Sequence, residues 1–247
     1  MEWRRIYFIV KGDILMLAKT GVEQRLIEVR QRIAQAAARS KRDPRAIRLL
    51  AVSKTQPVRS IEEAYQAGQR TFAENRVQEW LEKAPDLPKD CQWHLVGRLQ
   101  TNKVKYLDQN VAMIHSLDRL SLLETLNEQG ERRGIVWTTL VQVNIARDPA
   151  KAGLMPEEVP DFLNSVRDCP HVRVQGVMTI GALEASLSET QGYFRQLREL
   201  RDTLQARKWP GVDLQELSMG MSQDFELAIE EGATFVRVGR QIFGERN

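Results

Sequence analysis

The amino-acid sequence predicts a single α/β domain folded as a (β/α)8 barrel of the TIM type. Its length of 247 residues is close to the ~250 residues that are typical of this fold. Eight short runs rich in β-branched and apolar residues alternate with longer stretches that have helical periodicity. Strands joined by single helices run parallel, and eight such units favour a closed barrel over a doubly wound open sheet, which is the alternative.

The expected elements follow one another in regular order. An extra helix comes first, over Thr20–Arg39, because apolar residues recur there at three- and four-residue spacing from Val22 to Ala37. Two later helices, over Ser60–Gly68 and Ser222–Gly232, are expected to begin at a serine cap and to end at glycine. The eight expected strands are Ile47–Thr55, Thr71–Asn75, Trp93–Gly97, Met113–Leu117, Thr138–Ile145, Val172–Ile180, Leu214–Met219 and Thr234–Phe243.

Composition excludes several classes of function. Hydrophobic residues make up 42% of the chain and charged residues 28%, and no apolar stretch approaches the ~20 residues that span a bilayer. A net charge of +3 without a long basic run argues against nucleic-acid binding. Cys91, Cys169, His115 and His171 lack the spacing of metal ligands and are interpreted as structural. We therefore expect a cytoplasmic protein without a metal site, a membrane association or a disulfide framework.

The first residues need separate treatment. The basic pair Arg4 and Arg5 precedes the short apolar run Ile6–Val10, which ends at Lys11 and is too short for a signal peptide. We hypothesise that residues 1–15 form a dispensable extension and that residues 16–247 form the barrel domain. The chain has no linker rich in proline, glycine or serine that would divide it further.

Lys54 is the first candidate for chemistry. In an α/β barrel, ligand-binding residues collect at the C-terminal ends of the strands, and Lys54 directly follows the apolar run Leu49–Val52 and Ser53. Partial burial lowers the pKa of a lysine and increases the fraction of neutral amine that can attack an aldehyde to form an imine. The alternative is an ordinary surface lysine at a strand end.

A phosphate site is expected across the barrel mouth from Lys54. The seventh strand leads into a turn that contains Ser218, Gly220 and Ser222, ahead of a helix whose first N–H groups are free. The eighth strand ends in Arg237–Arg240, where Gly239 allows close approach of a ligand and two arginines offer charge-assisted hydrogen bonds. Barrels commonly bind phosphate at strands seven and eight. A lysine that faces a phosphate site indicates pyridoxal 5′-phosphate (PLP), a cofactor with both an aldehyde and a phosphate.

Several segments, in this order, resemble the PLP homeostasis protein family. They are Ala51–Thr55, Ala73–Glu79, Trp93–Lys103, Gly176–Gly181, Leu217–Ser222 and Val236–Gly244. The similarity extends from about Val22 to the C-terminus. It implies a barrel similar to that of alanine racemase, which is fold type III among PLP-binding proteins.

The resemblance implies a PLP imine on Lys54. It also implies that Arg237 lies near the pyridine nitrogen or the phosphate. Beside the nitrogen, a guanidinium would oppose its protonation and make the ring a poorer electron sink. The residues implied around the phosphate are Ser218, Gly220, Ser222, Gly239 and Arg240. Further pocket positions are Asn75, His94, Gly97, Met178 and Thr179.

Two of these positions stay open. His94 either lines the pocket or is a hydrogen-bonded histidine that holds the end of its strand. Ala73 stands where many relatives have glycine, which weakens the case for close approach of the backbone to the ligand at that position.

The expected function is PLP binding without catalysis. Racemases and decarboxylases on such a barrel need a second acid/base residue, which an additional domain usually supplies, and the 247 residues leave no room for that domain. We therefore expect a monomeric reservoir or carrier that serves PLP-requiring apoenzymes and influences amino-acid and keto-acid balance. The alternatives are a weak amino-acid racemase and a phosphosugar-type barrel enzyme that forms an imine at Lys54.

Overall fold

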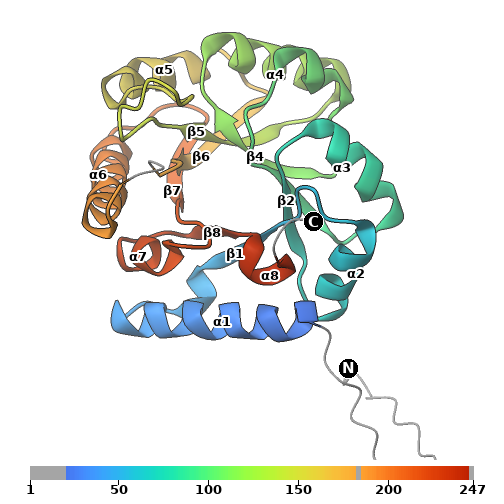
Figure 1. The fold of residues 1–247 in the computed structure, drawn as a ribbon. Helices are drawn as coiled ribbons and strands as arrows, with labels where there is room; N and C mark the ends of the chain where they lie inside the picture. Colours follow the sequence, from blue (N-terminus) through green and yellow to red (C-terminus); the bar gives the residue numbers. More distant parts are fainter. Residues whose placement is uncertain (1–20, 182–184, 245–247) are drawn as a thin grey trace, which may run out of the picture.

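The computed structural model describes residues 21–181 and 185–244. Eight parallel strands pair in chain order, and β8 pairs with β1 to close the barrel (Figure 1). The strands are β1 (Arg48–Val52), β2 (Thr71–Glu74), β3 (Gln92–Leu95), β4 (Val111–Leu117), β5 (Trp137–Gln142), β6 (Val172–Met178), β7 (Val212–Ser218) and β8 (Phe235–Val238). The predicted (β/α)8 barrel is confirmed.

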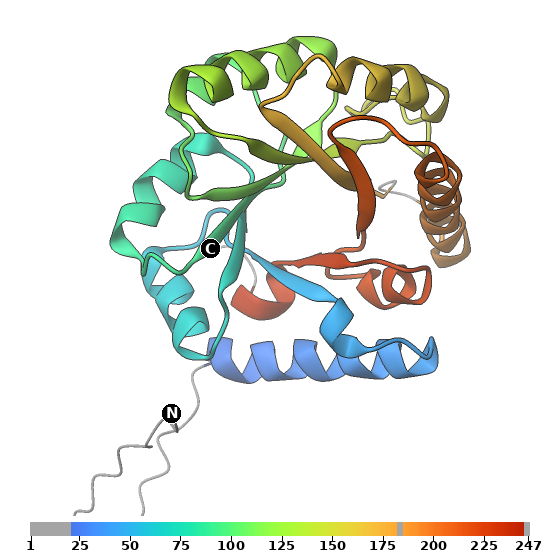
Figure 2. The same cartoon turned by 180° about the vertical axis from the view of Figure 1, so that it is seen from behind.

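An additional helix, α1 (Gly21–Arg39), precedes the first strand as expected. It lies along the outside of the barrel beside α2, α7 and α8, in both the front and the back view (Figures 1 and 2). The helices that follow the strands are α2 (Val58–Gln66), α3 (Val77–Lys83), α4 (Leu120–Arg133), α5 (Val159–Val166), α6 (Leu187–Gln205), α7 (Phe225–Glu230) and α8 (Arg240–Phe243). The short 3-10 helices are η1 (Pro44–Ala46), η2 (Ala84–Asp86), η3 (Thr101–Tyr106) and η4 (Pro156–Glu158).

The connection between β3 and β4 differs from the expected pattern. It contains the six-residue 3-10 helix η3 in place of an α-helix. Val104 is the only buried residue of this segment. Without an apolar stripe to pack on the barrel, a longer helix has little tertiary stabilisation.

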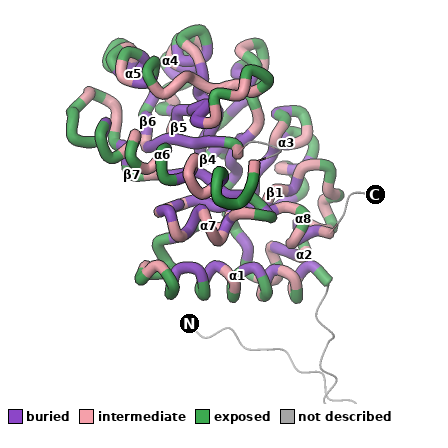
Figure 3. The backbone as a smooth tube through the Cα atoms, turned by 60° about the vertical axis from the view of Figure 1, so that its left-hand side comes forward, coloured by how far each residue is buried: buried purple, intermediate pink, exposed green. Residues whose placement is uncertain are grey.

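Two apolar layers hold the barrel together. The inner layer contains one side chain from each of six strands and one, Val96, from just beyond β3. It fills the barrel with Leu50, Ala73, Val96, Met113, Leu140, Met178 and Phe235. The outer layer lies between the strands and the helices. Figure 3 shows the buried positions concentrated along the strands and on the inner faces of the helices. The filled interior confines a ligand to the mouth of the barrel.

Several predicted boundaries were wrong. Helix α2 begins at Val58 after Pro57, so Ser60 lies inside the helix and does not cap it. Helix α7 begins at Phe225, three residues beyond Ser222, and Asp224 is the residue before its first turn. Strand β8 ends at Val238, and the residues up to Phe243 form α8. The expected glycine endings are correct, since Gly68 and Gly232 have φ angles of +85° and +104°, which favour glycine.

The proposed N-terminal extension, residues 1–15, lies outside the described residues. Within the described ranges, no helix is both long and apolar enough to cross a membrane. The same ranges contain no group of three or more His, Cys, Asp or Glu side chains that could hold a metal ion.

Candidate functional site

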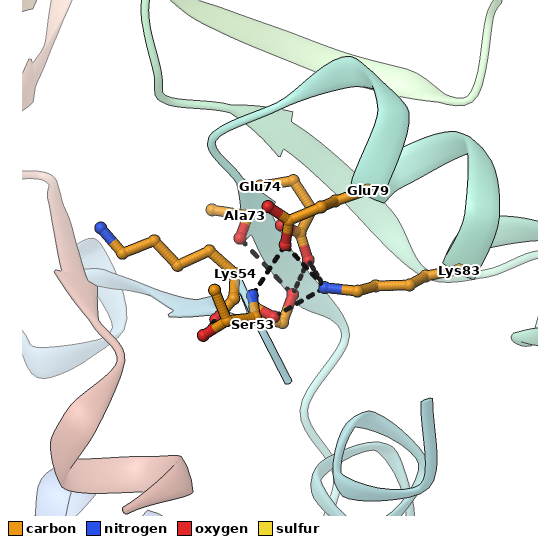
Figure 4. A network of polar contacts seen from close by, with 7 residues as sticks. Ser53, Lys54, Ala73, Glu74, Glu79 and Lys83 are labelled. Carbon is orange, nitrogen blue, oxygen red and sulfur yellow. Dashed lines mark hydrogen bonds and ion pairs between the residues drawn. The ribbon is translucent and has the colours of Figure 1, made fainter. Parts of the chain in front are cut away.

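Lys54 lies at the C-terminal end of β1, where the barrel opens. Its neighbour Ser53 is fully buried, whereas Lys54 is half-buried and lines a cavity of about 600 Å³. We call this space the Lys54 cavity. In Figure 4 the Lys54 side chain extends away from the polar cluster behind its backbone. The next residue, Thr55, has a φ angle of 63°, a strained conformation for a β-branched residue.

A second lysine, Lys83 on α3, holds the backbone before Lys54 directly and the backbone after it through Glu79. Its Nζ donates to the Ser53 carbonyl (2.9 Å), to Glu74 (2.8 Å) and to Glu79 (3.2 Å) (Figure 4). The same two carboxylate oxygens each accept a second hydrogen bond. Glu74 Oε1 accepts from the Ser53 hydroxyl at 2.8 Å, and Glu79 Oε2 accepts from the Thr55 amide at 2.7 Å. The network fixes the turn from which Lys54 projects.

The two carboxylates of this network respond differently to their surroundings. Burial raises the pKa of Glu74, and the hydrogen bond and positive charge of Lys83 only partly oppose the shift. For Glu79, burial is outweighed by the Thr55 amide and by Lys83, so its pKa is lowered. Sequence reasoning did not identify Lys83. The four-residue spacing of Glu79 and Lys83 on one helix is the signal that could have suggested the ion pair.

The structure brings six of the ten predicted cofactor residues into the lining of one cavity. These six are Lys54, Asn75, Ser222, Arg237, Gly239 and Arg240. The lining also includes Gly97, which the family resemblance implied. Lining residues that the sequence did not single out are Val52, Gln56, Val96, Arg98, Ile180, Met221, Gln223, Asp224 and Gly244.

The other four predicted residues lie behind this lining. Met178 is part of the inner apolar layer. Gly220 has a φ angle of +86°, and a Cβ atom there would lie 2.5 Å from the Ala228 Cβ, so only glycine allows α7 to pack this closely. Ser218 and His94 are buried and belong to a hydrogen-bonded chain that leads to the cavity.

Arg237 is the buried cation of the site. Its guanidinium donates to the Ser218 hydroxyl and to the Thr179 carbonyl, both at 2.7 Å. Burial lowers its pKa to about 10, although the nearby Asp224 opposes the shift, so Arg237 remains charged at neutral pH. Burial raises the pKa of Asp224, whose carboxylate accepts from the Met221 amide at 2.5 Å. Arg237 and the Lys54 amine thus line one cavity from the neighbouring strands β8 and β1, and not from opposite sides of the barrel mouth as expected.

Two histidines extend the chain from Ser218 into the barrel. His115 Nδ1 lies 2.9 Å from the Ser218 Oγ, and His115 Nε2 lies 2.8 Å from His94 Nδ1. Burial lowers the pKa of His94 to about 3 and also lowers the pKa of His115, so both are neutral at pH 7. Of the two interpretations of His94, its burial and its bond to His115 favour the structural one.

Ala73 lies in the inner layer, on β2 beside His94, and is completely buried. Thr179 is buried too; its hydroxyl donates to the Val143 carbonyl at 2.9 Å. Gly239 packs against β1, where a Cβ atom would lie 3.0 Å from the Val52 carbonyl oxygen. The glycine therefore serves the contact between the ends of β1 and β8.

The sequence of the chain is similar to those of known proteins. The sequence model of the alanine racemase N-terminal domain matches residues 25–247. A pyridoxal phosphate homeostasis protein from Aquifex aeolicus is 46% identical over 224 residues, which cover 90% of this chain and 97% of the relative. A protein of the same description from Homo sapiens is 40% identical over 245 residues, which cover 94% of this chain and 89% of the relative.

The fold of the chain is also similar to solved structures. The structure of PipY from Synechococcus elongatus with PLP bound has a TM-score of 0.78 and 38% sequence identity, and the match covers 90% of this chain and all of PipY (100%). An alanine racemase from Clostridium difficile has a TM-score of 0.71 at 16% identity, over 91% of this chain and 56% of the racemase. This more distant similarity concerns the fold alone.

Proposed function

Because this chain belongs to the pyridoxal phosphate homeostasis protein family, we propose that it binds PLP in the Lys54 cavity and acts as a reservoir or carrier of the cofactor. The observation that carries the proposal is the placement of Lys54 in one cavity with Ser222, Arg237 and Arg240. An amine for the aldehyde and two guanidinium groups for the phosphate thus face the same space.

The cavity suits the cofactor in size and chemistry. Its volume of about 600 Å³ is within the range of roughly 300–1,000 Å³ that is usual for small-molecule sites. Lys54 would hold the aldehyde carbon as an imine, and Ser222, Gly239 and Arg240 would surround the phosphate. Arg237 would lie beside the ring nitrogen or the phosphate. When bound, PLP supplies a reactive aldehyde and a π-system that can accept electrons.

The charges around the cavity favour storage over turnover. Arg237 next to the ring nitrogen would oppose its protonation and so reduce the capacity of PLP to stabilise a carbanion. Among the described lining residues, Asp224 is the only carboxylate, and it already accepts a hydrogen bond from the Met221 amide. A reversible imine on Lys54 would keep a reactive aldehyde away from other amines until an apoenzyme takes it. We expect this carrier to be a cytoplasmic monomer.

The test compares the wild-type chain with Lys54→Ala and with the control Lys89→Ala, which removes an exposed lysine. After incubation with PLP, wild type and Lys89→Ala should show imine absorbance, and borohydride should fix the cofactor on the peptide that contains Lys54. Lys54→Ala should show neither. A reduced adduct on another lysine of the wild-type protein would refute the assignment, and absence of imine absorbance would favour the phosphosugar-type enzyme.

The racemase alternative makes a different prediction. If Lys54 acted as the acid/base group together with bound water, the PLP-loaded protein would exchange the α-proton of an amino-acid enantiomer in deuterated water faster than free PLP does. We expect exchange no faster than with free PLP. Exchange faster than that of free PLP would refute the pure carrier and establish the enzyme.

A further inference from the structure

A second and larger cavity adjoins the Lys54 cavity. It has a volume of about 860 Å³ and lies between the ends of β2 and β3, the start of α3, and η3. We call it the basic groove. Its lining consists of Asn75, Arg76, Val77, Gln78, Leu95, Gly97, Arg98, Leu99, Gln100, Thr101, Asn102, Lys103 and Arg119.

The groove carries a strong excess of positive charge. Its lining contains four cations, Arg76, Arg98, Lys103 and Arg119, and no carboxylate. One acid lies behind it: the buried Asp118 binds Arg98 at 3.2 Å through one oxygen and Arg119 through the other. Four positive charges minus one leaves three in excess. Amide and hydroxyl groups provide most of the remaining polar lining, so the groove suits a small anion with more than one charge.

Part of this charge is held in place before any ligand arrives. Besides its contact with Asp118, Arg119 donates to the Leu99 carbonyl at 2.8 Å. The side chains of Asp118 and Arg119 are 3% and 27% exposed, so solvent screens their attraction only in part. Arg119 therefore loses little freedom when an anion binds, which favours affinity. The Arg98 side chain is 65% exposed, so solvent screens its ion pair with Asp118 more strongly.

The groove and the Lys54 cavity meet at three shared residues, Asn75, Gly97 and Arg98. The backbone at this junction is very close, because a Cβ atom on Gly97 would lie 2.2 Å from the Asn75 carbonyl oxygen. Gly97 thus keeps the ends of β2 and β3 together, and Arg98 lines both spaces. A ligand in the groove would lie beside the opening to Lys54.

From the volume, the charge excess and the shared wall, we propose that the basic groove is a second binding site, specific for phosphate monoesters. A phosphate monoester carries close to two negative charges at neutral pH, which the three excess positive charges of the groove would neutralise. The binding site itself is independent of the imine at Lys54. Its use as a waiting position for incoming or departing PLP rests on the proposed function.

The experiment measures binding of phenyl phosphate, which has no aldehyde, to the full-length Lys54→Ala chain by calorimetry. Two saturable sites are expected, one in each cavity. Adding Arg76→Ala or Lys103→Ala should weaken one of them by about tenfold or more, the usual scale for loss of one charged hydrogen bond. Lys105→Ala is the matched control, since Lys105 lies on the same 3-10 helix but outside the groove, and it should leave both sites unchanged.

Further variants separate the two cavities. Arg240→Ala, in the Lys54 cavity, should weaken only the other site. A single site that responds to Arg240→Ala and not to Lys103→Ala would overturn the groove proposal without touching the proposed function. Conversely, groove binding without a borohydride adduct on wild-type Lys54 would overturn the proposed function alone.

In a parallel titration, binding of inorganic phosphate with no binding of phenyl phosphate would also refute the groove proposal. Unchanged thermal melting of each variant confirms folding, and Lys103→Gln replaces any variant that fails this check.

Discussion

Lys54 and Lys83, 29 positions apart, show how different surroundings give the same type of side chain two different roles. Lys83 is nearly buried between Glu74 and Glu79, so it serves as a structural cation that holds the backbone of Ser53. Lys54 projects from the turn held in this way and lines the cavity. Its position could be predicted because it directly follows an apolar strand. The partnership of Lys83 with Ser53 could not, because the contact joins residues 30 apart and depends on how α3 packs against β2, the strand beside β1.

The buried histidine pair gives a pH dependence of stability. The pKa of His94 is lowered to about 3, so the unfolded chain binds a proton below pH 6.5 that the folded protein does not bind. Stability should therefore fall as the pH drops through this interval. At pH 5 the expected loss for His94 alone is about 2 kcal/mol relative to pH 7, from 1.36 kcal/mol per pKa unit. His115, whose pKa shifts in the same direction, should add to the loss.

Urea unfolding at pH 7 and pH 5 measures this effect. The double variant His94→Leu/His115→Leu should show a much smaller difference in unfolding free energy between the two pH values than wild type. His171→Gln is the control, because His171 lies outside the barrel interior and contacts the Ile135 carbonyl. An equal difference in wild type and double variant would show that other groups cause the acid sensitivity.

At the scale of elements, sequence periodicity predicted the number and order of strands well. The first residues of the helices were harder to predict. Ser60 and Ser222 were expected to cap helices, but α2 begins after Pro57 and α7 begins after Asp224. Pro57 has a fixed φ and begins α2 earlier than the serine would. Ser222 remains in the turn and lines the cavity, which fits its predicted phosphate role but not its predicted capping role.

The cavity-lining residues that follow the ends of strands could be predicted from the sequence. The polar contacts inside the barrel could not. Lys54, Ser222 and Arg240 follow strands β1, β7 and β8 and meet in one cavity, as the topology of a barrel requires. His94 was left with two interpretations, because its sequence neighbours do not reveal His115, which lies 21 residues away on the adjacent strand. The groove lined by η3 went unrecognised because a helix was expected there.

At the scale of the whole molecule, α1 completes the outer layer where the two ends of the barrel sheet meet. Its apolar face is buried against α2, α7 and α8, so the first of the helices that follow a strand and the last two share one packing surface. Leu26, at the middle of that face, is completely buried. These contacts of α1 stabilise this side of the barrel.

This arrangement leads to a prediction about the proposed extension. A chain that begins at Met16 should retain the wild-type free energy of unfolding and the Lys54 imine, because it keeps all of α1. Leu26→Ala in the full chain should instead lower the free energy of unfolding by about 2–5 kcal/mol, the usual cost of removing a buried leucine side chain. Urea unfolding and borohydride trapping measure both outcomes. A loss of several kcal/mol in the shortened chain, similar to that of Leu26→Ala, would mean that residues 1–15 belong to the folded domain.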